Sequence, residues 1–247
     1  GTGVLNLGTD SVTVSGAGFA LEGSQPATTV AAGNSVTFQV KFDPSTAGAV
    51  TGSVSIANDD ADENPYNFNI SGTGLIPEMN VQGNSTDIAD GDTSPDTGDH
   101  TAFGDVEVNG GSVTRIFTIQ NTGTGILNLG SNSVTISGTG FALEGSQPAT
   151  TVAAGNSVTF QVKFDPSVAG AATGSVSIAN DDADENPYNF NISGTGLIPE
   201  MNVQGNSTDI ADGDTSPDAG DHTAFGDVEV NGGSVTRTFT IQNTGTG

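Results

Sequence analysis

Apolar and polar residues alternate along Ser157–Pro166, a stretch whose sequence also occurs at Ser35–Pro44. Every second residue is apolar, and the residues between are polar up to the terminal Asp-Pro: the apolar set is Val158, Phe160, Val162 and Phe164. A period of two is typical of a strand with one face buried and the other in water. Such a strand needs a second apolar layer over its inner face, so the other short strands predicted along the chain are interpreted as its partners.

Shorter segments of similar pattern are predicted as further strands: Val4–Leu7, Val12–Val14, Phe19–Leu21, Val36–Phe42, Gly52–Ile56, Tyr66–Ile70 and Pro77–Val81. Asp105–Val108 and Ser112–Gln120 flank Asn109-Gly110-Gly111, and Asn-Gly favours a primed two-residue turn, so these two segments are predicted to form a β-hairpin. No segment has a helical period. The pattern therefore predicts an all-β fold.

The whole pattern repeats after 122 residues. Residues 1–122 align with 123–244 without a gap, nine positions differ, and 113 of 122 are identical. Residues 245–247 begin a third copy. A period of this length is the size of a domain, so the repeat predicts a tandem array of domains in which each unit does the same job.

The domain boundary is predicted at the Gly-Thr-Gly segments that follow a complete strand, at 72–74 and 194–196. Residues 75–196 are then one whole domain, 1–74 the back part of the preceding domain and 197–247 the front part of the next. Each partial domain would expose strand edges and half a core. Two solutions are open: the chain is a piece of a longer one, as the lack of an initiator Met at Gly1 also indicates, or neighbouring molecules complete each other by strand donation in a head-to-tail filament.

The composition of the chain limits the classes of partner that it is expected to bind. The formal charge is −25, and only four residues are basic. A surface this negative repels nucleic acid and anionic membranes, so neither is expected as a partner. There is no Cys, which excludes disulfides and thiolate metal sites. No apolar run approaches the length of a membrane helix, and no signal peptide is recognised at the N-terminus.

Two sets of motifs resemble a known family. Its front half is matched by Pro77–Val81, Phe103–Val106 and Phe117–Gly123, and its back half by Val158–Pro166, Val176–Asp182 and Phe190–Gly196. In combination these resemble the "choice-of-anchor D" repeat of large bacterial surface proteins, which is related to the Hydin-like (ASH) domains. The resemblance implies tandem immunoglobulin-like β-sandwich domains in secreted or surface-anchored proteins, without catalytic activity.

Two acidic clusters are candidate Ca²⁺ sites, because Ca²⁺ prefers six to eight oxygen ligands and closely spaced Asp with Gly turns can supply them. The first cluster is Asp59, Asp60, Asp62 and Glu63, with its copy at Asp181, Asp182, Asp184 and Glu185. The second is Asp87, Asp90, Asp92, Asp96 and Asp99, with its copy at Asp209, Asp212, Asp214, Asp218 and Asp221. Asp87–Asp92 in the second cluster resembles a calcium loop loosely, but the regular spacing of an EF-hand loop is absent. The alternative is a solvated negative loop that aids solubility.

The leading functional hypothesis is a structural repeat of an extracellular fibre or giant cell-surface protein, whose partners are neighbouring copies of the same repeat and whose stiffness depends on linkers or bound Ca²⁺. The alternative is an adhesin module that binds a glycan or protein through its acidic loops, although Trp is missing and only two Tyr offer a sugar platform. An enzyme is not expected: Asp96-Thr97-Gly98 spells the aspartic-protease tripeptide, but the next copy reads Asp218-Ala219-Gly220.

Overall fold

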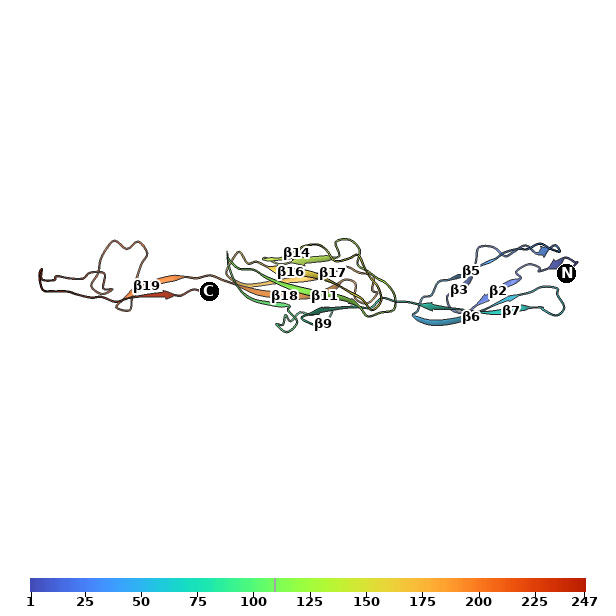
Figure 1. The fold of residues 1–247 in the computed structure, drawn as a ribbon, viewed down its shortest axis with the longest axis horizontal. Coiled ribbons are helices and arrows are strands. Elements are labelled where there is room, and N and C mark those ends of the chain that lie inside the picture. Colours follow the sequence, from blue (N-terminus) through green and yellow to red (C-terminus); the bar gives the residue numbers. More distant parts are fainter. Residues whose placement is uncertain (109) are drawn as a thin grey trace. The chain divides into compact units, whose positions relative to one another are not determined.

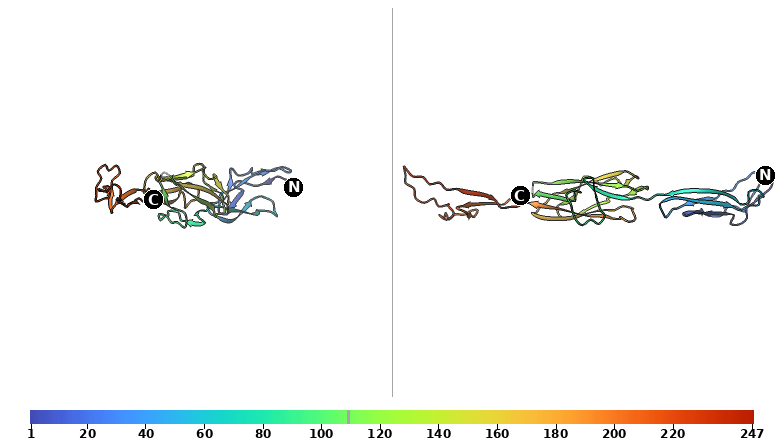
Figure 2. Two further views of the ribbon diagram at one scale, coloured as in Figure 1. Left: turned by 60° about the vertical axis from the view of Figure 1, so that its left-hand side comes forward. Right: turned by 90° about the horizontal axis from the view of Figure 1, so that it is seen from below.

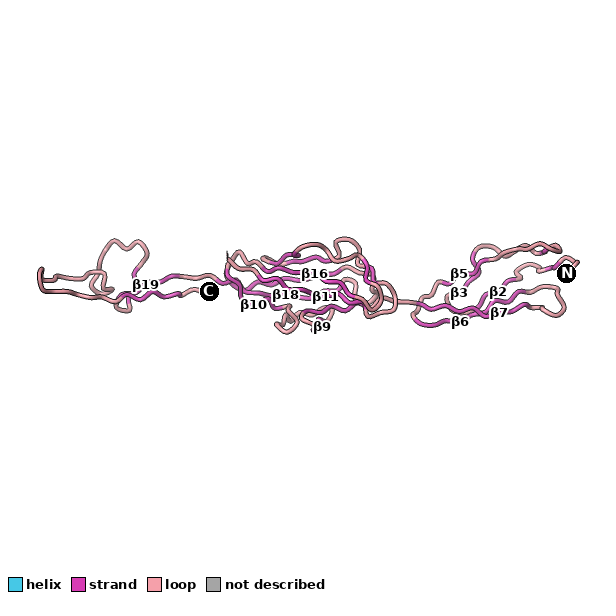
Figure 3. The backbone as a smooth tube through the Cα atoms, viewed as in Figure 1, coloured by secondary structure: helices cyan, strands magenta, loops and turns pink. Residues whose placement is uncertain are grey.

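The computed structural model describes residues 1–108 and 110–247, and every regular element in these residues is a strand (Figures 1 and 3). The all-β prediction is confirmed. The chain divides into two compact units. One comprises residues 1–78 with 123–126, and the other comprises 79–122 with 127–247.

Two facing sheets of the second unit form a β-sandwich from residues 79–197, called here the central sandwich. One sheet is antiparallel throughout, in the order β14 (Phe141–Glu144), β16 (Ser157–Phe164), β11 (Val113–Asn121), β8 (Met79–Gly83) and β9 (Thr86–Ile88). The other has the order β10 (Ala102–Glu107), β18 (Tyr188–Leu197), β17 (Gly170–Ile178) and β13 (Val134–Ser137), with β10 parallel to β18. A separate two-stranded antiparallel sheet is formed by β12 (Leu127–Asn128) and β15 (Thr151–Val152). The strands run lengthwise along the sandwich (Figure 2).

The alternating stretch at 157–166 is the strand β16, as predicted, and its apolar face lines the core. Phe160, Val162 and Phe164 are buried, and β16 pairs along its whole length with β11. Phe117 of β11 lies between the two sheets, with its ring centroid 5.5 Å from the rings of both Phe160 and Phe190. Close aromatic packing of this kind fills the space between the sheets.

The hairpin predicted around Asn109-Gly110-Gly111 is wrong. β10 and β11, which flank this turn, lie in different sheets, so the connection crosses from one layer of the sandwich to the other. The reason is that β11 already pairs with β8 on one side and β16 on the other, whereas β18 has an edge that β10 fills. An Asn-Gly dipeptide indicates a local reversal of the chain but not which strands then pair. Asn109 itself lies outside the described residues.

The first unit repeats only part of this architecture. Its sheets are β2 (Val12–Ser15), β6 (Gly48–Ile56) and β7 (Tyr66–Gly74); β3 (Phe19–Glu22) with β5 (Gln39–Phe42); and β1 (Leu5–Asn6) with β4 (Thr29–Val30). β5 is shorter than the predicted strand Val36–Phe42 and than its copy β16. In the central sandwich, residues 157–160 pair only with β11, and residues 35–38 have no such partner.

The last segment folds in the same partial way. Its sheet contains β20 (Thr208–Ile210), β19 (Met201–Gly205) and β21 (Phe239–Asn243). Residues 235–238 and 224–229, which are copies of parts of β11 and β10, are not strands. A strand thus forms in this chain only where a neighbouring strand is present to complete its hydrogen-bond ladder.

Candidate functional site

The loop at residues 84–102, which carries the second acidic cluster, closes the free edge of β18. The N–H of Gly91 donates to the carbonyl of Asn189 (2.7 Å), and the N–H of Asn191 donates to the carbonyl of Asp92 (2.8 Å). Asp90 adds a side-chain bond, because its Oδ1 accepts the N–H of Asn189 at 2.7 Å. The loop therefore covers an edge that would otherwise be open to another strand.

The other carboxylates of this cluster are each used separately. Asp87 Oδ1 accepts hydrogen bonds from Asn80 Nδ2 (2.8 Å) and Gln82 Nε2 (2.7 Å), and these two donors lower the pKa of Asp87. Asp96 accepts the N–H of Gly98, and buried Asp99 accepts both the N–H and the hydroxyl of Thr101. The same bonds recur in the copy at Asp209, Asp218 and Asp221.

Within the described residues, no three carboxylates of the second cluster or of its copy have oxygens that lie close enough together to hold one cation. Each oxygen that accepts a backbone or side-chain donor is also less available to a cation. The geometry thus favours the solvated-loop alternative here, with the carboxylates organising the loop itself.

The first cluster is arranged differently, because three of its carboxylates converge. Oxygens of Asp182, Asp184 and Glu185 lie within 4.8 Å of one another and of an oxygen of Glu78, which the sequence analysis missed. The copy brings together oxygens of Asp60, Asp62 and Glu63 within the same distance. Asn180 shapes the loop: its Nδ2 donates to the carbonyls of Ile178 (3.1 Å) and Glu185 (2.8 Å), and its Oδ1 accepts the N–H of Asp182. An all-oxygen group of this kind is the type of site that Ca²⁺ prefers.

The remaining acid of the first cluster, Asp181, and its copy Asp59 do not join the converging carboxylates but accept hydrogen bonds from an asparagine. Asp181 accepts hydrogen bonds from the N–H and Nδ2 of Asn128, and Asp59 accepts the same bonds from Asn6. The bonds from Asn6 lower the pKa of Asp59. These two acids therefore bind the loop to a short strand, which is β12 for Asp181 and β1 for Asp59.

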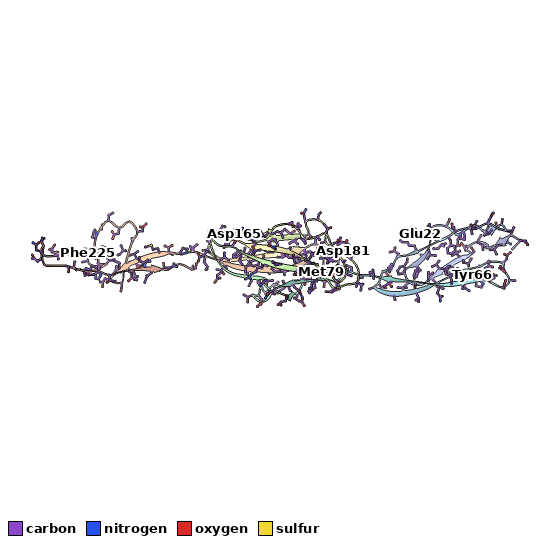
Figure 4. The ribbon with its side chains drawn as sticks, viewed as in Figure 1. Glu22, Tyr66, Met79, Asp165, Asp181 and Phe225 are labelled. Carbon is purple, nitrogen blue, oxygen red and sulfur yellow. The ribbon has the colours of Figure 1, made fainter. Side chains whose placement is uncertain are left out.

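Asp182 has a second role that the sequence did not suggest. Its Oδ2 accepts the N–H of Met79 at 2.6 Å, although 103 residues separate the two along the chain. Both groups are buried, with 3% of each residue exposed. In Figure 4, Met79 and the loop residue Asp181 lie at one end of the sandwich and Asp165 lies at the other. The loop that carries Asp182 thus holds the first residue of β8 in place.

Two further side chains join residues 79–122 to residues 127–197, a junction called here the seam. The hydroxyl of Tyr188 donates to the carbonyl of Ile88, and Nδ2 of Asn121 donates to the carbonyl of Val152 at 2.9 Å. Burial raises the pKa of Tyr188 to about 12. In the sequence, the only indication of this role is that Tyr188 alternates with Phe190 and Ile192 and so lies on the apolar face of its strand.

Residues on both sides of the seam are buried in the central sandwich and exposed in their copies. Met79 is 3% exposed and Met201 67%; Phe117 is 0% exposed and Phe239 40%; Tyr188 is 3% exposed and Tyr66 53%. Burial of one such side chain contributes roughly 1.5–3 kcal/mol. Closing the seam therefore stabilises both parts through many side chains at once.

Comparison with known proteins agrees with this architecture. Residues 97–186 match the family model "ASH: Abnormal spindle-like microcephaly-assoc'd, ASPM-SPD-2-Hydin". The matched segment is ASH-like. It runs from the acidic loop before β10 to the loop before β18, and so crosses the seam. The expected relation to ASH-type, immunoglobulin-like domains is confirmed for these residues, while the narrower "choice-of-anchor D" assignment stays a prediction.

Similar solved structures share little sequence with this chain. A protein of unknown function from Porphyromonas gingivalis W83 is 13% identical with a TM-score of 0.36, and the match covers 77% of this chain and 87% of that one. The secreted serine protease VesC from Vibrio cholerae is 17% identical with a TM-score of 0.33, over 40% of this chain and 22% of that one. No curated protein matches. Within the described residues, no helix is long and apolar enough to cross a membrane.

Proposed function

We propose that this chain is a non-catalytic structural repeat of an extracellular fibre or cell-surface protein, in which sandwiches follow one another along the chain and carry tension. The ASH-like, immunoglobulin-like segment supports a structural or interaction module. The near-identity of the copies supports a role in which every unit does the same job. The strongly acidic composition suits a surface in contact with solvent.

The observation that carries the proposal is that the chain enters and leaves the central sandwich at opposite ends. Met79 starts β8 beside Asp182, at the same end as Tyr188, and β18 then runs away from that end to Leu197. Tension along the chain is therefore directed parallel to the strands. Ladder hydrogen bonds lie perpendicular to the strands, so many of them resist such tension together, in shear.

Single-molecule pulling tests this property. The chain has no Cys, so handles can be attached at chosen sites. Pulling from the two ends should unfold the central sandwich in one event that lengthens the chain by about 400 Å, at about 3.6 Å per extended residue. The matched control attaches handles at Ser131→Cys and Ala183→Cys, two exposed positions at one end of the adjacent strands β13 and β17.

Pulling on the control pair separates β13 from β17 one bond at a time, so its unfolding force should be clearly lower than the end-to-end force. Equal forces in the two geometries would contradict the proposed role of the sandwich in resisting tension.

Calcium at the first acidic cluster is the second part of the proposal. In the central sandwich Glu78 converges with three carboxylates of the first cluster, and these four groups repel one another. A divalent cation would relieve this repulsion and stabilise the folded state by mass action. We expect millimolar Ca²⁺ to raise the unfolding midpoint of the central sandwich relative to chelator. The rise should be lost in Asp184→Asn with Glu185→Gln and kept in the control Asp92→Asn. An unchanged midpoint in the unmodified chain would leave the cluster as a solvated loop.

A further inference from the structure

The linker that leads into the central sandwich, residues 75–78, is bonded to the Gly-Thr-Gly loop at residues 123–125, called here the clamp. The carbonyl of Ile76 accepts the N–H of Thr124 (2.9 Å) and the N–H of Gly125 (2.7 Å). The hydroxyl oxygen of Thr124 accepts the N–H of Ile76 at 3.3 Å. These bonds continue the ladder of β8 and β11 beyond the start of β8. The linker is therefore fixed to the clamp through its backbone.

The two glycines of the clamp permit this close approach. A Cβ added to Gly123 would lie 2.5 Å from the carbonyl oxygen of Ile76 and 2.5 Å from the nitrogen of Glu78. One added to Gly125 would lie 3.0 Å from the carbonyl carbon of Ile76. The nearest atoms belong to the backbone, so no flexible side chain can move aside. Glycine is the residue that lets two backbones come this close.

Backbone bonds fix the linker because its side chains contribute little burial. Leu75 is 60% exposed and Ile76 is 49% exposed. Pro77 also restrains the linker, because its ring fixes its own φ and biases the residue before it towards an extended conformation. An extended Ile76 is what a β-ladder requires.

The same bonds recur where the chain leaves the central sandwich. The carbonyl of Ile198 accepts the N–H of Thr246 (2.8 Å) and that of Gly247 (3.0 Å), and the N–H of Ile198 donates to the hydroxyl oxygen of Thr246 (3.1 Å). The residue before it, Leu197, is still part of β18, and its carbonyl accepts the N–H of Val108 at 2.8 Å. At this joint the two sets of bonds are held by adjacent residues.

Very little chain therefore lies between one bonded segment and the next. Gly74 is the last residue of β7 and pairs with Gly48, and Ile76 is already bonded to the clamp. Leu75 is the single residue between them. Each residue contributes two soft backbone dihedral angles, φ and ψ. A joint of one residue has far fewer conformations than a flexible linker of several residues.

We infer that the clamp stiffens the joint between consecutive domains, because it binds the linker to the following sandwich and confines bending to Leu75. This inference rests on the proposed function as a structural repeat, in which each domain transmits tension to the next. Gly-Thr-Gly occupies the same place in the 122-residue period at residues 1–3, 123–125 and 245–247. The device therefore belongs to the repeat and stiffens each joint in the same way.

Pulsed electron paramagnetic resonance on the 247-residue chain tests the stiffness. The chain has no Cys, so one spin label can be attached at Thr51→Cys in β6 and another at Thr159→Cys in β16, two exposed positions. The width of the distance distribution reports how far residues 1–74 swing relative to the central sandwich. Chelator is present throughout, which separates this property from any effect of Ca²⁺. The unmodified chain should give one narrow distribution.

Two variants open the clamp. Gly123→Ala places a Cβ against the linker backbone and should widen the distribution about twofold, because more residues of the linker then rotate. Thr124→Val keeps the shape of the side chain but removes the acceptor of the Ile76 N–H, and should widen it less. The control Gly110→Ala, whose Cβ meets nothing within 4 Å, should match the unmodified chain. Thermal unfolding of the central sandwich checks that each variant is folded.

A broad distribution in the unmodified chain overturns the inference, and so does a width that neither variant changes. If Gly123→Ala does not fold, Thr124→Val decides against the same control. The pulling experiment measures the unfolding force of the central sandwich and not the freedom of the joint, so the inference and the proposed function can fail independently.

Discussion

At the scale of single residues, a few polar contacts determine how distant parts of the sandwich meet. Asp182 binds the N–H of Met79 across 103 residues of sequence, and the hydroxyl of Tyr188 binds the carbonyl of Ile88 across 100. These groups are buried, so each donor and acceptor depends on the other for its hydrogen bond. Their copies Asp60 and Tyr66 are exposed, and together they form natural matched controls.

Removing the Asp182 carboxylate should destabilise the central sandwich. In Asp182→Ala the N–H of Met79 loses its acceptor in a buried position, which costs about 1–3 kcal/mol of unfolding free energy. Urea denaturation followed by circular dichroism in dilute solution measures this change. Asp60→Ala, at an exposed position, should leave the unfolding of the central sandwich unchanged. Equal effects of the two substitutions would contradict the role given to Asp182.

Tyr188 should ionise only in strong base. Its pKa is raised to about 12, mainly by burial, against about 10 in an unfolded chain. The folded state then keeps a proton that the unfolded state loses. Stability is therefore fully present below pH 10 and falls between about pH 10 and 12. Phenolate absorbance in a Tyr66→Phe background, where Tyr188 is the only tyrosine, measures the midpoint. A midpoint near 10 with the sandwich still folded would contradict the buried environment.

At the scale of elements, contacts between segments close in sequence form in every copy. Strands that pair with a distant segment form only where that segment is present. A Cβ added to Gly83 of β8 would lie 1.8 Å from the carbonyl oxygen of Asp99, and one added to Gly205 would lie 1.7 Å from that of Asp221. The acidic loop therefore packs on its own strand in both copies. By contrast, residues 35–38 and 235–238 are not strands, because the strand that would pair with them is absent.

Gly83→Ala should disrupt the packing of the acidic loop on β8. No flexible side chain can move aside, since the nearest atom is a backbone oxygen, so we expect a loss of about 3 kcal/mol of unfolding free energy. Gly110→Ala is the control, because a Cβ there meets nothing within 4 Å. Chemical denaturation compares the two. Similar stabilities of the two variants would show that the loop can shift freely.

At the scale of the whole molecule, charge opposes folding. The formal charge of the chain is −25, so the compact state brings like charges close together. Dissolved salt screens this repulsion over about 10 Å at 0.1 M ionic strength but leaves the apolar contacts in place. The unfolding midpoint of the central sandwich should therefore rise as NaCl is raised from about 10 mM to about 300 mM. Thermal unfolding followed by circular dichroism measures this change. A midpoint that falls in salt would indicate that ion pairs stabilise the fold instead.

Much of the fold could be predicted from residue pattern because the alternation of apolar and polar side chains is a local property. The strand at 158–164, the all-β class and the repeat of 122 residues were all readable in this way. The candidate site could be predicted only in part. The close spacing of acids predicted both clusters. Among the described residues, however, only the first cluster and its copy bring three of their carboxylates together, because hydrogen bonds hold those of the second apart.

The sequence alone determined which residues have an apolar inner face, and only the tertiary structure decided which of them form strands and a core. Val36–Phe38 and Val158–Phe160 are identical in sequence, yet only the second segment is a strand. Likewise, the turn after β10 joins two sheets instead of two paired strands. The physical reason is that a β-ladder is shared between segments far apart in the chain, so each strand depends on the presence of its partner.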